Sequence, residues 1–360
     1  MNFFCTTNIE KIKKIPIHFI FCTERTGSSM LTTMLNINKE VLCTSEELFS
    51  LYFYRRYKDK NKWSEKEISK FCIDLKLLME NSPEIYFSDF KTLQNNLTAF
   101  KENLDFQLLI RIIYLHFIEN KNKEEIKVIV DKQIKFLFHL ETVKEIFPES
   151  KIIVLTRDIR DNVISKSRRK INSNSNLLFH AGTWNETYKN VARLFELYPN
   201  KIFILHYEKL VTETEKTLIN ICSQLGVEFH KEMIEFNRYF SDFIELKSDE
   251  KNKSELSEIK VFHESMFKPV DSKLAGQWEQ KLDKKTAIKI ATVGYETGLK
   301  LGYDFGKPYG LSILNPVELK QIYKAYNNTT RLFNFYLKMP LGLKLFIKRS
   351  KRNLIKQETK

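Results

Sequence analysis

The segment Thr23–Leu31 (TERTGSSML) gathers residue types that bind an anion. It follows an apolar run that predicts a buried strand, and Gly27 permits the tight turn that a following helix requires. A helix N-terminus presents unpaired N–H groups and a positive dipole end, and nearby hydroxyl and guanidinium groups add donors. We therefore predict a phosphate or sulfate site here, formed by Arg25, Thr26, Gly27, Ser28, Ser29 and Met30.

This segment differs from the two common nucleotide-binding motifs. If Gly27 is the second glycine of a Walker A loop, Cys22 stands where the first glycine belongs and Ser28 where the lysine belongs. The dinucleotide pattern G-x-G-x-x-G is also missing. An atypical P-loop kinase stays an alternative, and so does a plain strand and helix with Arg25 on the surface.

A second candidate anion site follows another predicted strand, Lys151–Thr156. Arg157 comes directly after it, where open α/β sheets bind ligands, and Ser165 lies eight residues on, in the next helix. A guanidinium fork grips a phosphate bidentately. The alternative is that Arg157 merely pairs with Asp161. Two such sites on one sheet suit a nucleotide with phosphates at both ends of its ribose.

Four short apolar runs predict the strands of a parallel sheet. They are residues 15–22, 128–130, 151–156 and 201–206. Helical periodicity between them predicts an α/β fold with helical crossovers. Residues 51–127 are charged and helical in pattern, and we interpret them as an insertion.

Composition limits the class of protein. The 360 residues carry a formal net charge of +14, which favours polyanionic partners. Five scattered cysteines form no C-x-x-C pair, which favours a reduced, cytoplasmic location. We expect no signal peptide and no membrane-spanning segment, since no run approaches ~18 apolar residues. No carboxylate cluster suggests a metal, and no motif of RNA-binding modules is visible.

The C-terminal segment differs from the rest of the chain in its charge. Residues 338–360 contain eight Lys or Arg and one Glu, a net +7 or half the charge of the chain, interleaved with apolar residues. A basic amphipathic helix of this type binds a membrane surface or a polyanion, or it docks on the core with a solvated basic face. We expect one domain over residues 1–310 and a basic helical extension over 311–360.

These motifs resemble the sulfotransferases that use 3′-phosphoadenosine 5′-phosphosulfate (PAPS). Residues 25–31 (RTGSSML) resemble their 5′-phosphosulfate loop, and residues 157–165 (RDIRDNVIS) resemble their 3′-phosphate motif. Arginine at position 25 and Val130-Asp-Lys132 resemble carbohydrate-type members. The resemblance implies a P-loop-like three-layer α/β/α fold, PAPS as donor without a metal, and a carbohydrate or lipid-linked glycan as acceptor.

The resemblance also implies roles for single residues. Arg25 would stabilise the leaving phosphate, Arg157 and Ser165 would hold the 3′-phosphate, and Lys273 in a KLAGQW segment would contact the nucleotide. The family's Arg-Lys pair is replaced there by Asp271 and Ser272. A non-catalytic module that binds the product nucleotide is the alternative function.

An acidic residue should deprotonate the acceptor hydroxyl. Glu47 is our first candidate for this base and Glu46 our second, because carbohydrate-type members place a carboxylate after the first helix. A capping box at Ser45 is the structural alternative. Cytosolic members use a histidine instead, for which this chain offers His116, His180 and His263.

Overall fold

The computed structural model describes most of the chain. The described residues are 4, 8–46, 48–79, 90–117, 121–134, 136–168, 176–240, 264–307, 309–327, 331–347 and 350. The second half of the predicted tail, residues 348–349 and 351–360, therefore lies outside them.

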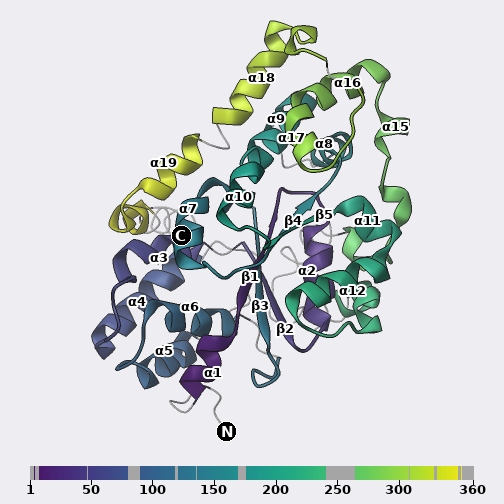
Figure 1. Cartoon of the computed structure of the whole chain (residues 1–360). Coiled ribbons are helices and arrows are strands. Elements are labelled where there is room, and N and C mark those ends of the chain that lie inside the picture. Colours follow the sequence, from purple (N-terminus) through teal and green to yellow (C-terminus); the bar gives the residue numbers. More distant parts are fainter. Residues whose placement is uncertain are drawn as a thin grey trace, which may run out of the picture.

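A parallel sheet of five strands forms the centre of the molecule (Figure 1). Its strands are β1 (Ile17–Cys22), β2 (Val41–Ser45), β3 (Val128–Gln133), β4 (Ile152–Thr156) and β5 (Ile202–His206), in the order β2-β3-β1-β4-β5. Four of these strands were predicted. The edge strand β2 was missed, because its sequence VLCTS carries only a short apolar signal.

All five strands end at one edge of the sheet, because every neighbouring pair is parallel. Register places Ser45 opposite Lys132, Cys22 opposite Leu155, and Thr156 opposite His206. The loops after the strands therefore share this carboxyl edge, which is where ligands of open α/β sheets bind.

Helices cover both faces of the sheet. Side chains alternate along β1, so that Phe19 and Phe21 face one core while Ile20 and Cys22 face the other. The first core also contains the helices α6 (Phe106–Leu115), α7 (Leu140–Ile146), α9 (Leu177–Tyr188) and α10 (Val191–Leu197). The second contains α2 (Ser28–Ile37) and α12 (Thr214–Leu225). The fold is thus a three-layer α/β/α sandwich, as predicted.

The predicted insertion is helical where it is described. It contains α4 (Glu65–Met79), α5 (Phe90–Ala99) and α6, and it begins within α3 (Phe49–Tyr57). The helix α1 (Ile9–Lys14) packs beside α6 (Figure 1). Asp105 caps α6 by accepting the N–H of Leu108 at 2.8 Å, which satisfies one of the free donors at the helix start.

Short helices follow β4 and β5. They are α8 (Ile159–Ser167), α11 (Tyr207–Thr212), the 3-10 turn Ser272–Leu274, α15 (Trp278–Lys281), α16 (Lys284–Val293) and α17 (Tyr295–Lys300). The helix α18 (Pro316–Tyr326) then packs on α9, where a Cβ on Gly182 would lie 2.9 Å from Ala325.

The described part of the tail docks on the protein. After α19 (Leu332–Lys338), residues 341–347 are helical, and Leu345 is buried in the first core. The ammonium group of Lys344 lies 4.7 Å from the ring centre of Tyr52. Burial lowers the pKa of Lys344 to about 8. Within the described residues, no helix combines the length and apolar character that crossing a membrane requires.

Candidate active site

The first predicted anion loop lies between β1 and α2. Gly27 stands before α2 with φ 81°, and a Cβ on it would lie 2.6 Å from the ring of Tyr207. Both the backbone conformation and the close ring therefore require glycine. Among the described residues no side chain caps α2, so its first N–H groups point out of the helix N-terminus as anion donors.

The two predicted anion segments meet directly. Nε of Arg25 donates to Oγ of Ser165 at 3.1 Å, and Nη1 of Arg157 donates to the carbonyl oxygen of Arg25 at 3.4 Å. Arg25 is half-buried and has φ 65°, in the left-handed region that non-glycine residues rarely adopt. The structure thus brings Arg25, Arg157 and Ser165 together in one site.

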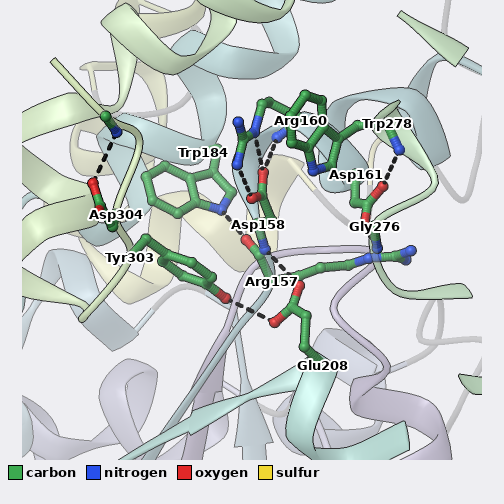
Figure 2. Close-up of polar contacts among 11 residues, drawn as sticks. Arg157, Asp158, Arg160, Asp161, Trp184, Glu208, Gly276, Trp278, Tyr303 and Asp304 are labelled. Carbon is green, nitrogen blue, oxygen red and sulfur yellow. Dashed lines mark hydrogen bonds and ion pairs between the residues drawn. The ribbon is translucent and has the colours of Figure 1, made fainter. Parts of the chain in front are cut away.

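Neighbouring elements fix Arg157 from several sides, and Figure 2 shows one of these contacts, the bond from Trp184 to its carbonyl. Its guanidinium lies 4.3 Å from the ring centre of Tyr207, and Nη2 donates to the carbonyl of Leu274 at 2.6 Å. Its own carbonyl accepts from Nε1 of Trp184 at 3.0 Å. Among the described residues, nothing accepts a hydrogen bond from its buried Nε. A buried charged donor without a protein acceptor fits an anionic ligand.

A carboxylate and an ammonium group pair at the ends of β2 and β3. Glu46 forms an ion pair and a short hydrogen bond with Lys132, whose side chain is 3% exposed. The N–H of Glu46 also donates to the carbonyl of Lys132 at 2.6 Å, and Glu46 has φ 61°. Two residues of this site, Arg25 and Glu46, therefore hold strained backbone conformations, which cluster at functional sites.

The thiol of Cys22 connects this ion pair to the first loop. Burial raises the pKa of Cys22 to about 11, and the charges of Lys132 and Glu46 act on the same thiol. The nearby hydroxyls of Ser28 and Thr26 oppose this rise in the pKa of Cys22. Register places Lys132 opposite Ile20 on the neighbouring strand β1, so the Lys132–Glu46 pair lies at the same edge of the sheet as the anion loop.

A buried network supports the ion pair from the other face of β3. The carboxylate of Asp131 accepts from the hydroxyl of Tyr114 at 2.6 Å, from Nε2 of Gln133 at 2.7 Å and from Oγ1 of Thr44 at 3.2 Å. Burial raises the pKa of Asp131 to about 7, although these hydrogen bonds oppose the shift.

The other predicted residues fall into three groups. In the loop, Thr26 and Ser28 are buried, and Ser29 and Met30 are half-buried. Lys273 is exposed, and its N–H donates to Asp271 at 2.9 Å. Glu47, our first candidate for the base, lies outside the described residues.

The three candidate histidines named from the sequence differ in where they lie. His116 is buried at the end of α6, where its ring nitrogens lie 2.9 Å from Nδ2 of Asn96 and 2.7 Å from the carbonyl of Ile112. Burial lowers the pKa of His116 to about 4, as expected for a core residue. His180 is buried on α9, and His263 lies outside the described residues.

Sequence reasoning missed the contributions of Tyr207 and Asp161. Tyr207 begins α11 directly after β5 and touches both Gly27 and Arg157. An aromatic residue directly after a predicted strand, at its carboxyl end, was the available signal. Across the described ranges, no group of three or more His, Cys, Asp or Glu side chains could hold a metal ion.

The fold and the site define a nucleotide-binding α/β protein whose anion donors gather at the carboxyl edge of its sheet. The sequence pattern of the sulfotransferase family matches residues 16–231, more than half of the chain. The chain therefore belongs to the sulfotransferase family, as the resemblance predicted.

Individual relatives agree with this family. Protein-tyrosine sulfotransferase 1 of Danio rerio is 22% identical over 86% of this chain and 80% of its own length. A provisionally named protein-tyrosine sulfotransferase of Caenorhabditis elegans is 22% identical over 46% of this chain, and the match spans only 61% of that protein. A solved sulfotransferase domain from the curacin biosynthetic pathway shares the fold, with a TM-score of 0.51, 18% identity, and coverage of 81% of this chain and 99% of that domain.

Proposed function

We propose that this chain transfers a sulfuryl group from PAPS to an acceptor hydroxyl. The observation that carries the proposal is the meeting of Arg25, Ser165 and Arg157 at one sheet edge, beside the Glu46–Lys132 pair. When bound, PAPS supplies a sulfuryl group on its 5′-phosphate and a second phosphate at the 3′ position. Donors stand at both ends of this site, and the buried Nε of Arg157 lacks a protein acceptor within the described chain.

We assign electrostatic stabilisation to Arg25 and to the N-terminus of α2. Negative charge that develops on the leaving phosphate is stabilised by fixed donors in a partly buried site. Arg157 and Ser165 bind and orient the 3′ end, and Lys273 remains a proposed contact. These groups need no metal ion for their part in the transfer, because each acts as a hydrogen-bond donor or a positive charge.

We assign the general base to a carboxylate of the 46–47 segment. Glu46 lies at the carboxyl end of β2 and can take the proton of an acceptor hydroxyl, while Lys132 holds the carboxylate in place. Glu47 remains the alternative. Glu46→Gln should reduce turnover by about 10²–10⁴-fold, the usual contribution of a general base. If Glu46→Gln keeps full activity and Glu47→Gln loses it, the base is Glu47.

We propose a carbohydrate or a lipid-linked glycan as acceptor. A sugar hydroxyl is far less acidic than a phenol, whose pKa is about 10, and so depends more on a positioned base. A tyrosine side chain in a peptide is the second candidate, since the two curated relatives carry the name protein-tyrosine sulfotransferase.

Radiolabelled PAPS with three acceptor sets decides between these candidates. Oligosaccharides, glycolipids and tyrosyl peptides are incubated with the wild-type chain and with Glu46→Gln. Label on a glycan that disappears in the variant supports the first candidate, and label on the peptide alone supports the second. A chain that binds the product nucleotide but labels none of them would be the non-catalytic module.

Contact with a membrane surface is a further part of the proposal, consistent with a cytoplasmic protein at the membrane face. The C-terminal extension exposes Phe335, Leu343 and Phe346 by 68%, 45% and 64%, and its sequence carries eight basic residues between 338 and 360. Apolar and basic side chains together favour anionic lipid. Sedimentation with phosphatidylserine vesicles, against phosphatidylcholine vesicles and a Phe335→Ser/Phe346→Ser variant, tests this contact.

A further inference from the structure

Asp161 ties the segment after the 3-10 turn Ser272–Leu274 to α8 (Figure 2). One carboxylate oxygen accepts the N–H of Gly276 at 2.7 Å, and the other accepts the N–H of Trp278 at 2.8 Å. Gly276 has φ 75°, and this left-handed turn is what aims two N–H groups, two residues apart, at one carboxylate.

Two further residues next to Asp161 hold the same segment. The guanidinium of Arg160 lies 3.6 Å from the ring centre of Trp278, and it bonds both oxygens of Asp158 at 3.0 Å and 2.6 Å. Arg157 donates to the carbonyl of Leu274. Arg157 and the first turn of α8 therefore hold residues 274–278 by their carbonyl, amide and ring groups.

The docking of this segment matters for Arg157, because its guanidinium donates a hydrogen bond to a carbonyl of the segment, that of Leu274. Nη2 bonds Leu274, Nη1 bonds the Arg25 carbonyl, and the face lies on Tyr207. If residues 274–278 move away, Arg157 loses its shortest hydrogen bond. The position of the Arg157 guanidinium therefore depends on whether residues 274–278 stay docked.

The carboxylate of Asp161 is buried, and its surroundings act on its pKa in both directions. Desolvation raises the pKa of Asp161, while the positive charge of Arg157 and the two N–H bonds oppose that rise. The negative charge of Asp158 also raises the pKa of Asp161. Glu208 accepts the N–H of Asp158 at 2.9 Å and the hydroxyl of Tyr303 at 3.1 Å, so its hydrogen bonds hold Asp158 rather than Asp161.

We infer that Asp161 is a positioning residue for nucleotide binding: it docks residues 274–278 on α8 and thereby aims Arg157 at the 3′-phosphate. This inference rests on the proposed function, because it places a donor nucleotide at Arg157. We assign Asp161 no direct role in the reaction; it acts through residues 274–278 and through Arg157.

Asp161→Asn is the direct test. An amide offers one acceptor oxygen where the carboxylate offers two, and its NH₂ group then opposes an N–H, so one of the two charge-assisted bonds is lost. We expect the Kd for 3′-phosphoadenosine 5′-phosphate (PAP) and the KM for PAPS to rise about tenfold, the cost of one such bond, while kcat stays within about twofold. A merely structural role would lower kcat with the folded fraction and leave KM unchanged.

Tryptophan fluorescence reports whether residues 274–278 stay docked in the ligand-free protein. The chain has three tryptophans, of which Trp63 and Trp184 are buried and Trp278 is half-buried on the segment. Acrylamide should quench ligand-free Asp161→Asn more strongly than wild type. Glu279→Gln is the matched control, because it removes one exposed carboxylate one residue after Trp278 and should match wild type in both measurements.

Gly276→Pro keeps the inference testable if Asp161→Asn does not fold. Proline removes the donated N–H and cannot adopt the left-handed turn, and a Cβ at this position would meet no described atom within 4 Å. It should raise the Kd for PAP and the quenching as Asp161→Asn does. Wild-type Kd and quenching in either folded variant would overturn the inference. If the wild-type protein binds no PAP, the proposed function is contradicted. In that case, stronger acrylamide quenching of Asp161→Asn than of wild type would still show that Asp161 docks the segment.

Discussion

Nε of Arg25 donates a hydrogen bond of 3.1 Å to Oγ of Ser165, although the two residues are 140 positions apart in the sequence. The bond joins the loop after β1 to the helix after β4. It links the residue assigned to the 5′ end of the donor with one assigned to the 3′ end, so the two halves of the site form one bonded unit.

Arg25→Ala should lower turnover by about two to three orders of magnitude. The guanidinium is a fixed positive donor at the proposed leaving phosphate, and loss of one such donor costs about 2.7–4 kcal/mol of barrier. Transfer from radiolabelled PAPS measures the effect. Arg238→Ala, at an exposed arginine, is the control and should keep wild-type turnover. A loss of less than tenfold in Arg25→Ala would refute the assigned role.

Arg157→Lys should reduce the preference for PAP over AMP by about tenfold or more. Lysine keeps the charge but loses the fork that grips a phosphate with two parallel bonds. Thermal unfolding with each nucleotide measures the preference, since a ligand at 100 times its Kd adds about 2.7 kcal/mol of stability. Ser165→Ala should shift the same ratio less. An unchanged PAP/AMP ratio in Arg157→Lys would show that the 3′-phosphate binds elsewhere.

Gly27→Ala should destabilise the loop by about 1–3 kcal/mol and weaken PAP binding. Alanine at φ 81° is strained, and its Cβ would lie 2.6 Å from the Tyr207 ring. Gly226→Ala is the matched control, because Gly226 has φ 74° at the end of α12 with nothing within 4 Å. Urea unfolding should show a smaller loss for the control and unchanged PAP affinity. Equal effects of the two variants would exclude the Tyr207 contact as the cause.

Asp131→Asn should change how stability depends on pH. The folded pKa of Asp131 is raised to about 7 from 3.8, so the folded state holds a proton that the unfolded state releases. Its contribution to stability is therefore full below pH 3.8 and is lost as the pH rises through 7. The unfolding free energy of wild type relative to Asp131→Asn should fall by about 1.4 kcal/mol per pH unit over this window.

Urea unfolding at several pH values between 4.5 and 8 checks this prediction. Asp59→Asn, at an exposed aspartate, should run parallel to wild type. Asp131→Asn curves parallel to wild type would mean that Asp131 is already ionised in the folded protein.

The central strands of the sheet and the two anion segments could be predicted from the sequence alone. Buried parallel strands leave continuous apolar runs, and the polar residues after them must share the carboxyl edge. That reasoning placed Arg25, Arg157 and Ser165 correctly relative to one another. It missed β2, because an edge strand of five residues with two polar ones gives no clear period.

Contacts made across the chain were beyond the sequence. The two hydrogen bonds that Asp161 accepts depend on where residues 274–278 lie in the fold, more than 110 positions further along the chain. Its local neighbour Arg157 made a simple surface pair look plausible, yet neither residue uses the other as its hydrogen-bond partner. The stacking of Tyr207 on Arg157 likewise depends on β5 lying next to β4, which no local pattern specifies.

The Lys132–Glu46 pair has a consequence for how substitutions at this edge of the sheet must be interpreted. The side chain of Lys132 is 3% exposed, so removing the carboxylate of Glu46 takes a negative partner away from a buried ammonium group. We therefore expect Glu46→Ala to lower folding stability as well as turnover. Glu46→Gln keeps an acceptor oxygen beside Lys132 and so separates the chemical loss from the folding loss.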